Sequence, residues 1–299
     1  MRIDWRGIVP ALSTPVDENG ALDEESLRSE VRWNIEKGAH LLAVSLMAGE
    51  FEKYTDAERI RCFEITVDEA SGKVPVLAGV SHSGTDPAVY LAKRARDIGA
   101  DGIVVLPPYF NNEKASLSLY DHFSTIASRV DLPVMIQDCE GVGPYICPSL
   151  YAKLAEDFDN MVSVKIEGIR AWEKMLETRR ILGDELAIFG GMAARNILQE
   201  LRIGISGNIP DACLTDVLVD VYESFAAGDV KKAEDTFRRY SLWLDFLNLH
   251  RLSNIEVEKE TLRLRGVIRS SFTRLPRGPL LDEETGAELK QILQNMSLI

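Results

Sequence analysis

The sequence is poor in cysteine, and its four cysteines show no familiar spacing. Cys62, Cys139, Cys147 and Cys213 include no C-x-x-C pair. A disulfide framework or a zinc site needs cysteines that are more numerous or more closely spaced. We therefore expect reduced thiols, no bound metal and a cytoplasmic location.

Positive charge is scarce relative to negative charge, and long apolar runs are missing. The 299 residues include 34 Lys and Arg against 47 Asp and Glu, a formal net charge of −13. Such a charge opposes binding to nucleic acid and to anionic membrane surfaces. No stretch reaches the length of a membrane span, and the opening Met-Arg-Ile-Asp-Trp-Arg lacks the apolar segment of a signal peptide. We expect neither nucleic acid nor membrane as a partner.

Short apolar runs alternate with amphipathic stretches over more than 200 residues. The eight strand candidates lie at residues 7–13, 41–46, 75–80, 102–106, 133–137, 162–166, 186–189 and 204–207. The stretches between them carry helix start signals, such as the capping box at residues 55–58. Eight βα units in series predict a (β/α)8 TIM barrel, with a doubly wound open sheet as the competitor. No G-x-G-x-x-G follows the first strand, so the usual mark of a dinucleotide-binding fold is missing.

The strand pattern stops after about residue 207, and the remaining chain is helical. Residues 229–246 and 282–294 have amphipathic helical spacing. We expect a barrel over residues 1–226 and a C-terminal helical extension over 227–299. The Lys231-Lys232 pair and the charged run at 256–259 are interpreted as solvated helix faces.

One predicted strand carries an unusual lysine. Alternation along residues 162–167 puts the apolar residues 162, 164 and 166 on one face and Ser163, Lys165 and Glu167 on the other. The ends of barrel strands hold the chemistry of this fold, so a polar face there points into an active site. We expect Lys165 to be a nucleophile; the competing interpretation is a solvated edge residue.

Several short motifs occur at the ends of the predicted strands and in the loops beside them. They are Thr14-Pro15, Gly49-Glu50, Gly99-Ala100-Asp101-Gly102, Pro108-Tyr109-Phe110, Leu132-Pro133 and Val164-Lys165. Their order and spacing resemble the dihydrodipicolinate synthase / N-acetylneuraminate lyase family of class I aldolases and dehydratases. The resemblance covers nearly the whole chain. It implies a homo-oligomer, a dimer or tetramer, in which Lys165 forms a Schiff base with pyruvate or another 2-oxo acid without an organic cofactor.

The sequence departs from the synthase at its proton relay. The synthase loop Gly-Thr-Thr-Gly-Glu is replaced here by one with Met47 and Ala48 before Gly49-Glu50, and both threonines are gone. Phe110 and Gln137 stand where the synthase has tyrosines, and neither carries a hydroxyl. Synthase activity is therefore not expected.

The strand-five and strand-six residues resemble a different subgroup. Gln137-Asp138 together with Lys165-Ile166-Glu167 resembles the subgroup that includes 2-keto-3-deoxy-L-arabonate dehydratase. This resemblance implies a carbon–oxygen lyase that dehydrates a 2-keto-3-deoxy sugar acid. Retro-aldol cleavage to pyruvate is the first alternative, followed by the synthase reaction and by a non-catalytic 2-oxo-acid-binding protein.

Chemistry and resemblance together identify the candidate site. A lysine amine attacks a ketone only when neutral, a form that enclosure favours and a nearby carboxylate opposes. Small residues in the second loop let backbone N–H groups approach the substrate carboxylate. The candidates are, for catalysis, Lys165, Glu167, Tyr109 and His82, and, for substrate binding, Ala48, Gly49, Gln137, Ser81 and Gly190.

Three of these candidates have plainer interpretations. Glu167 would serve equally as the ion-pair partner of a cation at the barrel rim. His82 fits a turn, where its ring nitrogen bonds to the backbone. Tyr109 fits simple packing at an interface.

Overall fold

Eight parallel strands form the barrel, in the order β1-β8-β7-β6-β5-β4-β3-β2. The structure, a computed structural model, describes residues 4–110 and 112–299. A parallel bridge between Ala11 and Ala43 joins the two ends of the sheet, and the N–H of Leu12 donates to the carbonyl of Ala43 at 2.8 Å. The sheet is thus a closed ring. The predicted (β/α)8 barrel is confirmed, and the open-sheet alternative is wrong.

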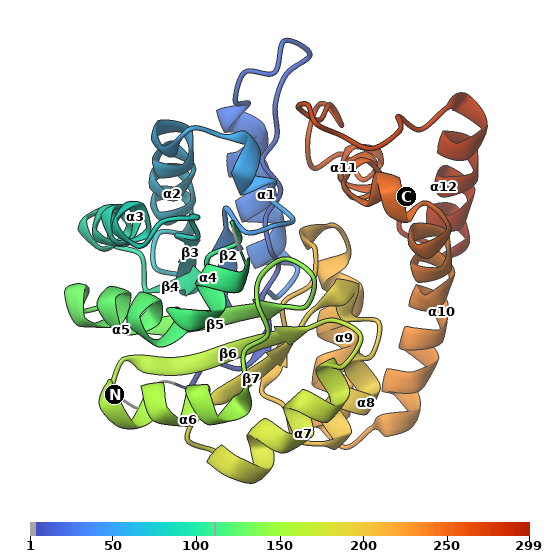
Figure 1. The fold of residues 1–299 in the computed structure, drawn as a ribbon. Helices are drawn as coiled ribbons and strands as arrows, with labels where there is room; N and C mark the ends of the chain where they lie inside the picture. Colours follow the sequence, from blue (N-terminus) through green and yellow to red (C-terminus); the bar gives the residue numbers. More distant parts are fainter. Residues whose placement is uncertain (1–3, 111) are drawn as a thin grey trace.

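The strands are short and the helices surround them (Figure 1). The strands are β1 (Gly7–Ile8), β2 (Leu42–Val44), β3 (Val76–Gly79), β4 (Gly102–Val105), β5 (Val134–Cys139), β6 (Met161–Glu167), β7 (Ala187–Gly190) and β8 (Gly207–Asn208). The barrel helices are α1 (Glu24–Glu36), α2 (Asp56–Ala70), α3 (Thr85–Ile98), α4 (Asn112–Leu117), α5 (Leu119–Arg129), α6 (Pro148–Asp157), α7 (Ala171–Leu182), α8 (Ile197–Arg202) and α9 (Thr215–Ala226). Short 3-10 turns follow three of the strands: η1 (Phe51–Lys53), η2 (Met192–Ala194) and η3 (Ala212–Leu214).

Two apolar layers hold the barrel together. The inner layer fills the ring and includes Leu77, Met135 and Phe189, all 0% exposed. The outer layer lies between strands and helices, and Leu27 and Val31 of α1 are fully buried in it. Each such burial stabilises the fold by about 1.5–3 kcal/mol.

A β-bulge in β6 decides which residues face the barrel interior. Val134 pairs with Met161 but Met135 pairs with Ser163, so Val162 is an extra residue on β6. Val162 consequently lies in the inner layer, whereas Val164 lies in the outer layer. The prediction that these two share a face is wrong, because strict alternation does not hold across a bulge.

Two strands differ in extent from the prediction. β1 ends at Ile8, since Pro10 has no N–H to give to a ladder, and only a bridge at Ala11 continues the pairing. β8 begins at Gly207 rather than at residue 204, because Gly204, with φ of 77°, ends the turn after α8. At Gly207 a Cβ atom would overlap the backbone of Gly7, so only glycine permits this strand approach.

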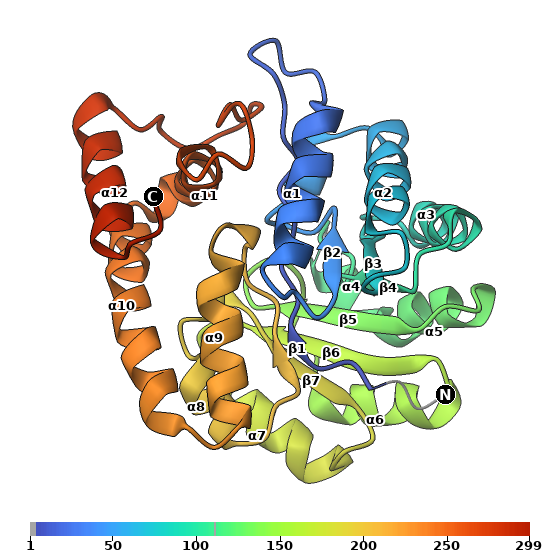
Figure 2. The same cartoon turned by 180° about the vertical axis from the view of Figure 1, so that it is seen from behind.

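The C-terminal helices form a layer beside the barrel, next to α9 (Figure 1 and Figure 2). They are α10 (Val230–Leu249), the 3-10 turn η4 (Arg251–Ser253), α11 (Asn254–Leu264) and α12 (Glu283–Asn295). Tyr240 and Trp243 of α10 are 1% exposed, and Trp243 Nε1 donates to Thr261 Oγ1 of α11 at 3.1 Å. The expected C-terminal helical extension is present.

No helix in the described part of the chain is long and apolar enough to cross a membrane.

Candidate active site

Lys165 and Glu167 lie side by side inside the barrel at the end of β6. Lys165 Nζ is 2.9 Å from Glu167 Oε2, and the two side chains are 6% and 8% exposed. They meet because residues i and i+2 of a strand share a face. The burial of Lys165 excludes the interpretation as a solvated edge residue.

Two further donors fix the carboxylate of Glu167. Gln137 Nε2 donates to Oε2 at 2.9 Å, and the backbone N–H of Met192 donates to Oε1 at 3.0 Å. Gln137 lies directly opposite Lys165 in the β5–β6 ladder. A buried carboxylate held by three donors has one orientation, which is what an acid or base at a reacting carbon requires.

The conformation of the loop after β7 directs the backbone N–H of Met192 toward Glu167. Met192, Ala193 and Ala194 have φ of 54°, 53° and 55°, a left-handed turn of three non-glycine residues. Each such residue costs about 1–2 kcal/mol. At Gly191 a Cβ atom would overlap the carboxyl group of Glu167. The strained turn and the glycine together let the backbone approach the carboxylate, and strain of this kind is concentrated at functional sites.

A cavity of about 580 Å³ opens above Lys165, at the C-terminal ends of the strands. We call it the C-terminal cavity. Ala48, Tyr109, Gln137, Lys165 and Glu167 line it, so the structure brings five of the nine predicted site residues together. Its walls also include residues of the β7 and β8 loops and of α10 and α11.

Tyr109 reaches the C-terminal cavity from the loop after β4. Its ring meets the ring of Phe51 edge to face, with centroids 5.9 Å apart. Burial raises the pKa of its phenol, so the hydroxyl is a proton donor rather than a phenolate.

The other four predicted residues are not among the lining residues of the C-terminal cavity. Ser81 is 3% exposed and its Oγ accepts the N–H of Leu106 at 2.9 Å. His82 Nδ1 accepts the N–H of Gly84 at 3.1 Å, the contact expected of a turn residue. Both side chains therefore bond to backbone in this structure.

Gly49 and Gly190 are needed for close packing next to the cavity. A Cβ atom on Gly49 would lie 2.9 Å from the carbonyl oxygen of Leu12. A Cβ atom on Gly190 would overlap the carboxyl group of Glu200 and the amide of Asn208. Burial raises the pKa of Glu200 to about 7, while its bond from Asn208 acts in the opposite direction.

A buried charge cluster supports the loop that carries Ala48 and Gly49. Glu50 is 1% exposed and has a left-handed backbone, with φ of 55°. Lys259 Nζ, on α11, donates to Glu50 Oε2 at 2.5 Å, and Lys53 pairs with the other carboxylate oxygen. The C-terminal extension thus anchors the second loop of the barrel.

The sequence analysis missed the acidic groups on the far wall of the cavity. Asp211 follows β8, and Glu258 projects from α11 with 5% exposure. The run at 256–259 was predicted to be a solvated helix face, and this is wrong, because Glu256, Glu258 and Lys259 are all buried. Lys231 and Lys232 are exposed, as predicted. The position of Asp211 at the end of a strand was the one available clue to these groups.

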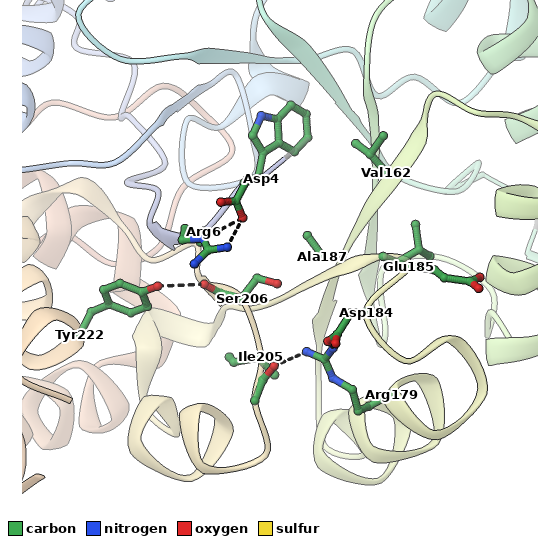
Figure 3. Close-up of a pocket in the computed structure, with 13 residues that line it drawn as sticks. Asp4, Arg6, Val162, Arg179, Asp184, Glu185, Ala187, Ile205, Ser206 and Tyr222 are labelled. Carbon is green, nitrogen blue, oxygen red and sulfur yellow. Dashed lines mark hydrogen bonds and ion pairs between the residues drawn. The ribbon is translucent and has the colours of Figure 1, made fainter. Parts of the chain in front are cut away.

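A second cavity, of about 700 Å³, lies at the opposite end of the barrel (Figure 3). Its cations are already engaged. Arg6 pairs with Asp4, and Arg179 pairs with Asp184 and donates to the carbonyl of Gly204 (Figure 3). With these two charges paired to neighbouring carboxylates, neither arginine is free to bind an anionic ligand in the second cavity.

No cluster of His, Cys, Asp and Glu in the described residues has the arrangement of a metal site. All four cysteines are free thiols.

Comparisons with known proteins agree with this geometry. The model of the "Dihydrodipicolinate synthetase family" matches residues 4–296. A 4-hydroxy-tetrahydrodipicolinate synthase of Methanopyrus kandleri is 31% identical, over 100% of this chain and 99% of its own. An L-2-keto-3-deoxyarabonate dehydratase of Azospirillum brasilense is 28% identical, over 97% of this chain and 94% of its own.

Solved structures match over the same extent. The dihydrodipicolinate synthase of Aquifex aeolicus superposes with a TM-score of 0.91 at 26% identity, covering 98% of this chain and 99% of that one. A prophage protein of the same family from E. coli K12, in complex with pyruvate, gives 0.89 at 26% identity, covering 99% of each chain. The chain belongs to the dihydrodipicolinate synthetase family and is a lyase of the class I aldolase type.

Proposed function

We propose that the protein dehydrates a 2-keto-3-deoxy sugar acid through a Schiff base on Lys165. The observation that carries this proposal is the Lys165–Glu167 pair, 2.9 Å apart and enclosed in a cavity large enough for a sugar acid. The relative from Azospirillum brasilense is named for such a reaction, and the E. coli structure contains pyruvate, a 2-oxo acid.

The pair supplies the nucleophile and the base. Transfer of a proton from Lys165 to Glu167 leaves a neutral amine, which attacks C2 of the substrate. Glu167 returns that proton to the carbinolamine hydroxyl, which leaves as water and gives an iminium ion. The Glu167 carboxylate then takes a proton from C3, and the resulting enamine expels the C4 hydroxyl, which needs a proton to leave as water. Hydrolysis of the iminium frees the product.

The residues around the pair support dehydration over the synthase reaction. Gln137 donates a hydrogen bond to Glu167. The synthase reaction would need a phenol at the position of Gln137 to relay protons. Phe110 has no hydroxyl and is 79% exposed. Among the described residues that line the C-terminal cavity, Tyr109 is the one tyrosine. Proton transfer therefore falls to carboxyl groups and to the single phenol of Tyr109. Ala48 lines the cavity, and in this proposal its backbone N–H receives the substrate carboxylate.

Trapping of the Schiff base is the direct test. Sodium borohydride added with pyruvate is expected to leave a reduced adduct on Lys165, detected by mass spectrometry of the peptide. Lys165→Ala should abolish the adduct, and Lys153→Ala, at an exposed lysine, is the matched control. An adduct that persists in Lys165→Ala would move the nucleophile elsewhere.

Glu167→Gln separates the two steps. The amide keeps the shape of the side chain but cannot act as a base at C3. We expect pyruvate still to be trapped on Lys165, more slowly because Glu167 no longer exchanges a proton with the lysine, while turnover of a panel of 2-keto-3-deoxypentonates and hexonates falls by about 10²-fold or more. Unchanged turnover would make Glu167 a structural residue. Pyruvate plus an aldehyde as products would identify retro-aldol cleavage instead.

A homodimer or homotetramer stays a prediction, which light scattering on the purified chain would test.

A further inference from the structure

Two carboxyl groups meet on the wall of the C-terminal cavity that the β8 loop and α11 form. Asp211 lies in the loop after β8, and its backbone is held by a parallel bridge to Ala11. Its side chain is hydrogen-bonded to the side chain of Glu258, and Asn254, one turn earlier on α11, bonds to Glu258 as well. Asp211 and Glu258 both line the same cavity as Lys165.

A hydrogen bond between two carboxyl groups requires a proton between them. Burial raises the pKa of Asp211 and raises that of Glu258 well above its usual value. The charge of Asp211 and its bond raise the pKa of Glu258 further, whereas the same bond lowers the pKa of Asp211. The pair therefore shares at least one proton while its two carboxyl groups are bonded to each other. The charges of Lys165 and Glu167 also act on Asp211, which places it within electrostatic reach of the reacting centre.

The protonation of this pair bears on the choice between the two reactions. Retro-aldol cleavage needs a base to take the proton of the C4 hydroxyl, whereas elimination needs an acid to protonate that hydroxyl as it leaves. Asp211 is partly exposed and Glu258 is 5% exposed, and both line the cavity. The described lining includes no histidine, so no imidazole competes for this role.

We propose that Asp211 is the proton donor to the departing C4 hydroxyl and that Glu258 is the positioning residue that keeps the pair protonated. This inference rests on the proposed dehydration. The electron pair of the C4–O bond leaves with the oxygen, the proton of the pair joins it, and water departs. The enamine electrons form the new C3–C4 double bond and restore the iminium. Glu167 then releases the proton taken from C3 to water, and the carboxyl pair takes up one proton in exchange, so the cycle releases only water from the substrate.

The test compares a leaving group that needs a proton with one that does not. The substrates are the 2-keto-3-deoxy acid of the panel that the wild type dehydrates fastest and its 4-fluoro analogue, because fluoride leaves without protonation. For Asp211→Asn we expect elimination of water to fall by about 10²-fold or more, and release of fluoride to change by less than about 3-fold. Borohydride trapping of pyruvate should be unchanged.

Glu258→Gln provides a second variant if Asp211→Asn folds poorly. It should lower the rate of water elimination by about ten-fold or more and leave the rate of fluoride release nearly unchanged. Glu256→Gln is the matched control, since Glu256 is buried on the same helix, bonds to Thr273 and does not line the cavity. Equal losses for both leaving groups, or no loss, would overturn the role of the pair. If the wild type eliminates water from no acid of the panel, the proposed dehydration itself is wrong.

Discussion

Replacement of Lys259 by methionine tests how strongly α11 is fastened to the second loop. Lys259 is 0% exposed, and its ammonium group donates to Glu50 at 2.5 Å and to the carbonyl of Phe272 at 3.3 Å. Breaking a buried ion pair costs about 3–5 kcal/mol, mostly because the remaining charge stays buried without its partner. Lys53 still faces Glu50, so we expect the lower end, about 3 kcal/mol. Methionine fills most of the lysine volume, so a cavity adds little.

A double-mutant cycle isolates the pair. Glu50→Gln alone leaves the Lys259 ammonium group without its main partner, whereas the double variant leaves neither charge alone. We therefore expect the loss of unfolding free energy in the double variant to be at least about 2 kcal/mol smaller than the sum of the losses in the two single variants. Urea unfolding, followed by circular dichroism and tryptophan fluorescence, measures each free energy if the two transitions coincide.

An exposed pair provides the control for this cycle. Lys232 bonds to Asp220 at 2.6 Å with a side chain that is 56% exposed, and Lys232→Met should change stability by no more than about 0.5 kcal/mol. Additivity of Lys259→Met and Glu50→Gln within about 0.5 kcal/mol would refute the argument that the two charges stabilise each other.

Two further perturbations test the buried acid on α1 and the close approach at β7. Burial raises the pKa of Glu30 from 4.5 to about 7, so the folded state holds this proton more tightly than the unfolded state and stability falls as pH rises through that range. Between about pH 5 and 8, the free energy of unfolding of Glu30→Gln should fall by up to about 3 kcal/mol less than that of the wild type, as measured by calorimetry. Parallel plots of stability against pH for the two proteins would contradict this. Gly191→Ala should cost about 1–3 kcal/mol and lower turnover, because the methyl group displaces Glu167. Gly286→Ala, in α12 with no atom within 4 Å, should instead stabilise the protein by about 0.5–1 kcal/mol, and a similar loss at both glycines would contradict the argument.

The local signals in the sequence were sufficient for the barrel. Alternation of apolar runs with capped helices depends on neighbouring residues alone, and the capping box at Thr55 and Glu58 is present in the structure. The Lys165 and Glu167 spacing is also local, since two residues on one face of a strand must meet. These predictions needed no knowledge of distant contacts.

The features that the sequence did not predict depend on distant contacts. The bulge at Val162 arises from pairing with β5, and the need for glycine at Gly207 arises from the close approach of the Gly7 backbone. Glu258 looks like a solvated helix residue by local spacing, and it is buried because α11 faces the open end of the barrel. Likewise, nothing local distinguishes a turn histidine such as His82 from a catalytic one.

The bond between Glu50 and Lys259 also sets an order of events during synthesis. The two residues are 209 positions apart, and α9 ends the barrel at Ala226 while α11 ends at Leu264. At about 5–20 residues per second, the ribosome adds the residues between the end of α9 and the end of α11 in about 2–8 s. During that time the emerging barrel has Glu50 without Lys259 and Asp211 without Glu258. A chain released after α9 would therefore lack both the anchor of the second loop and one member of the acid pair.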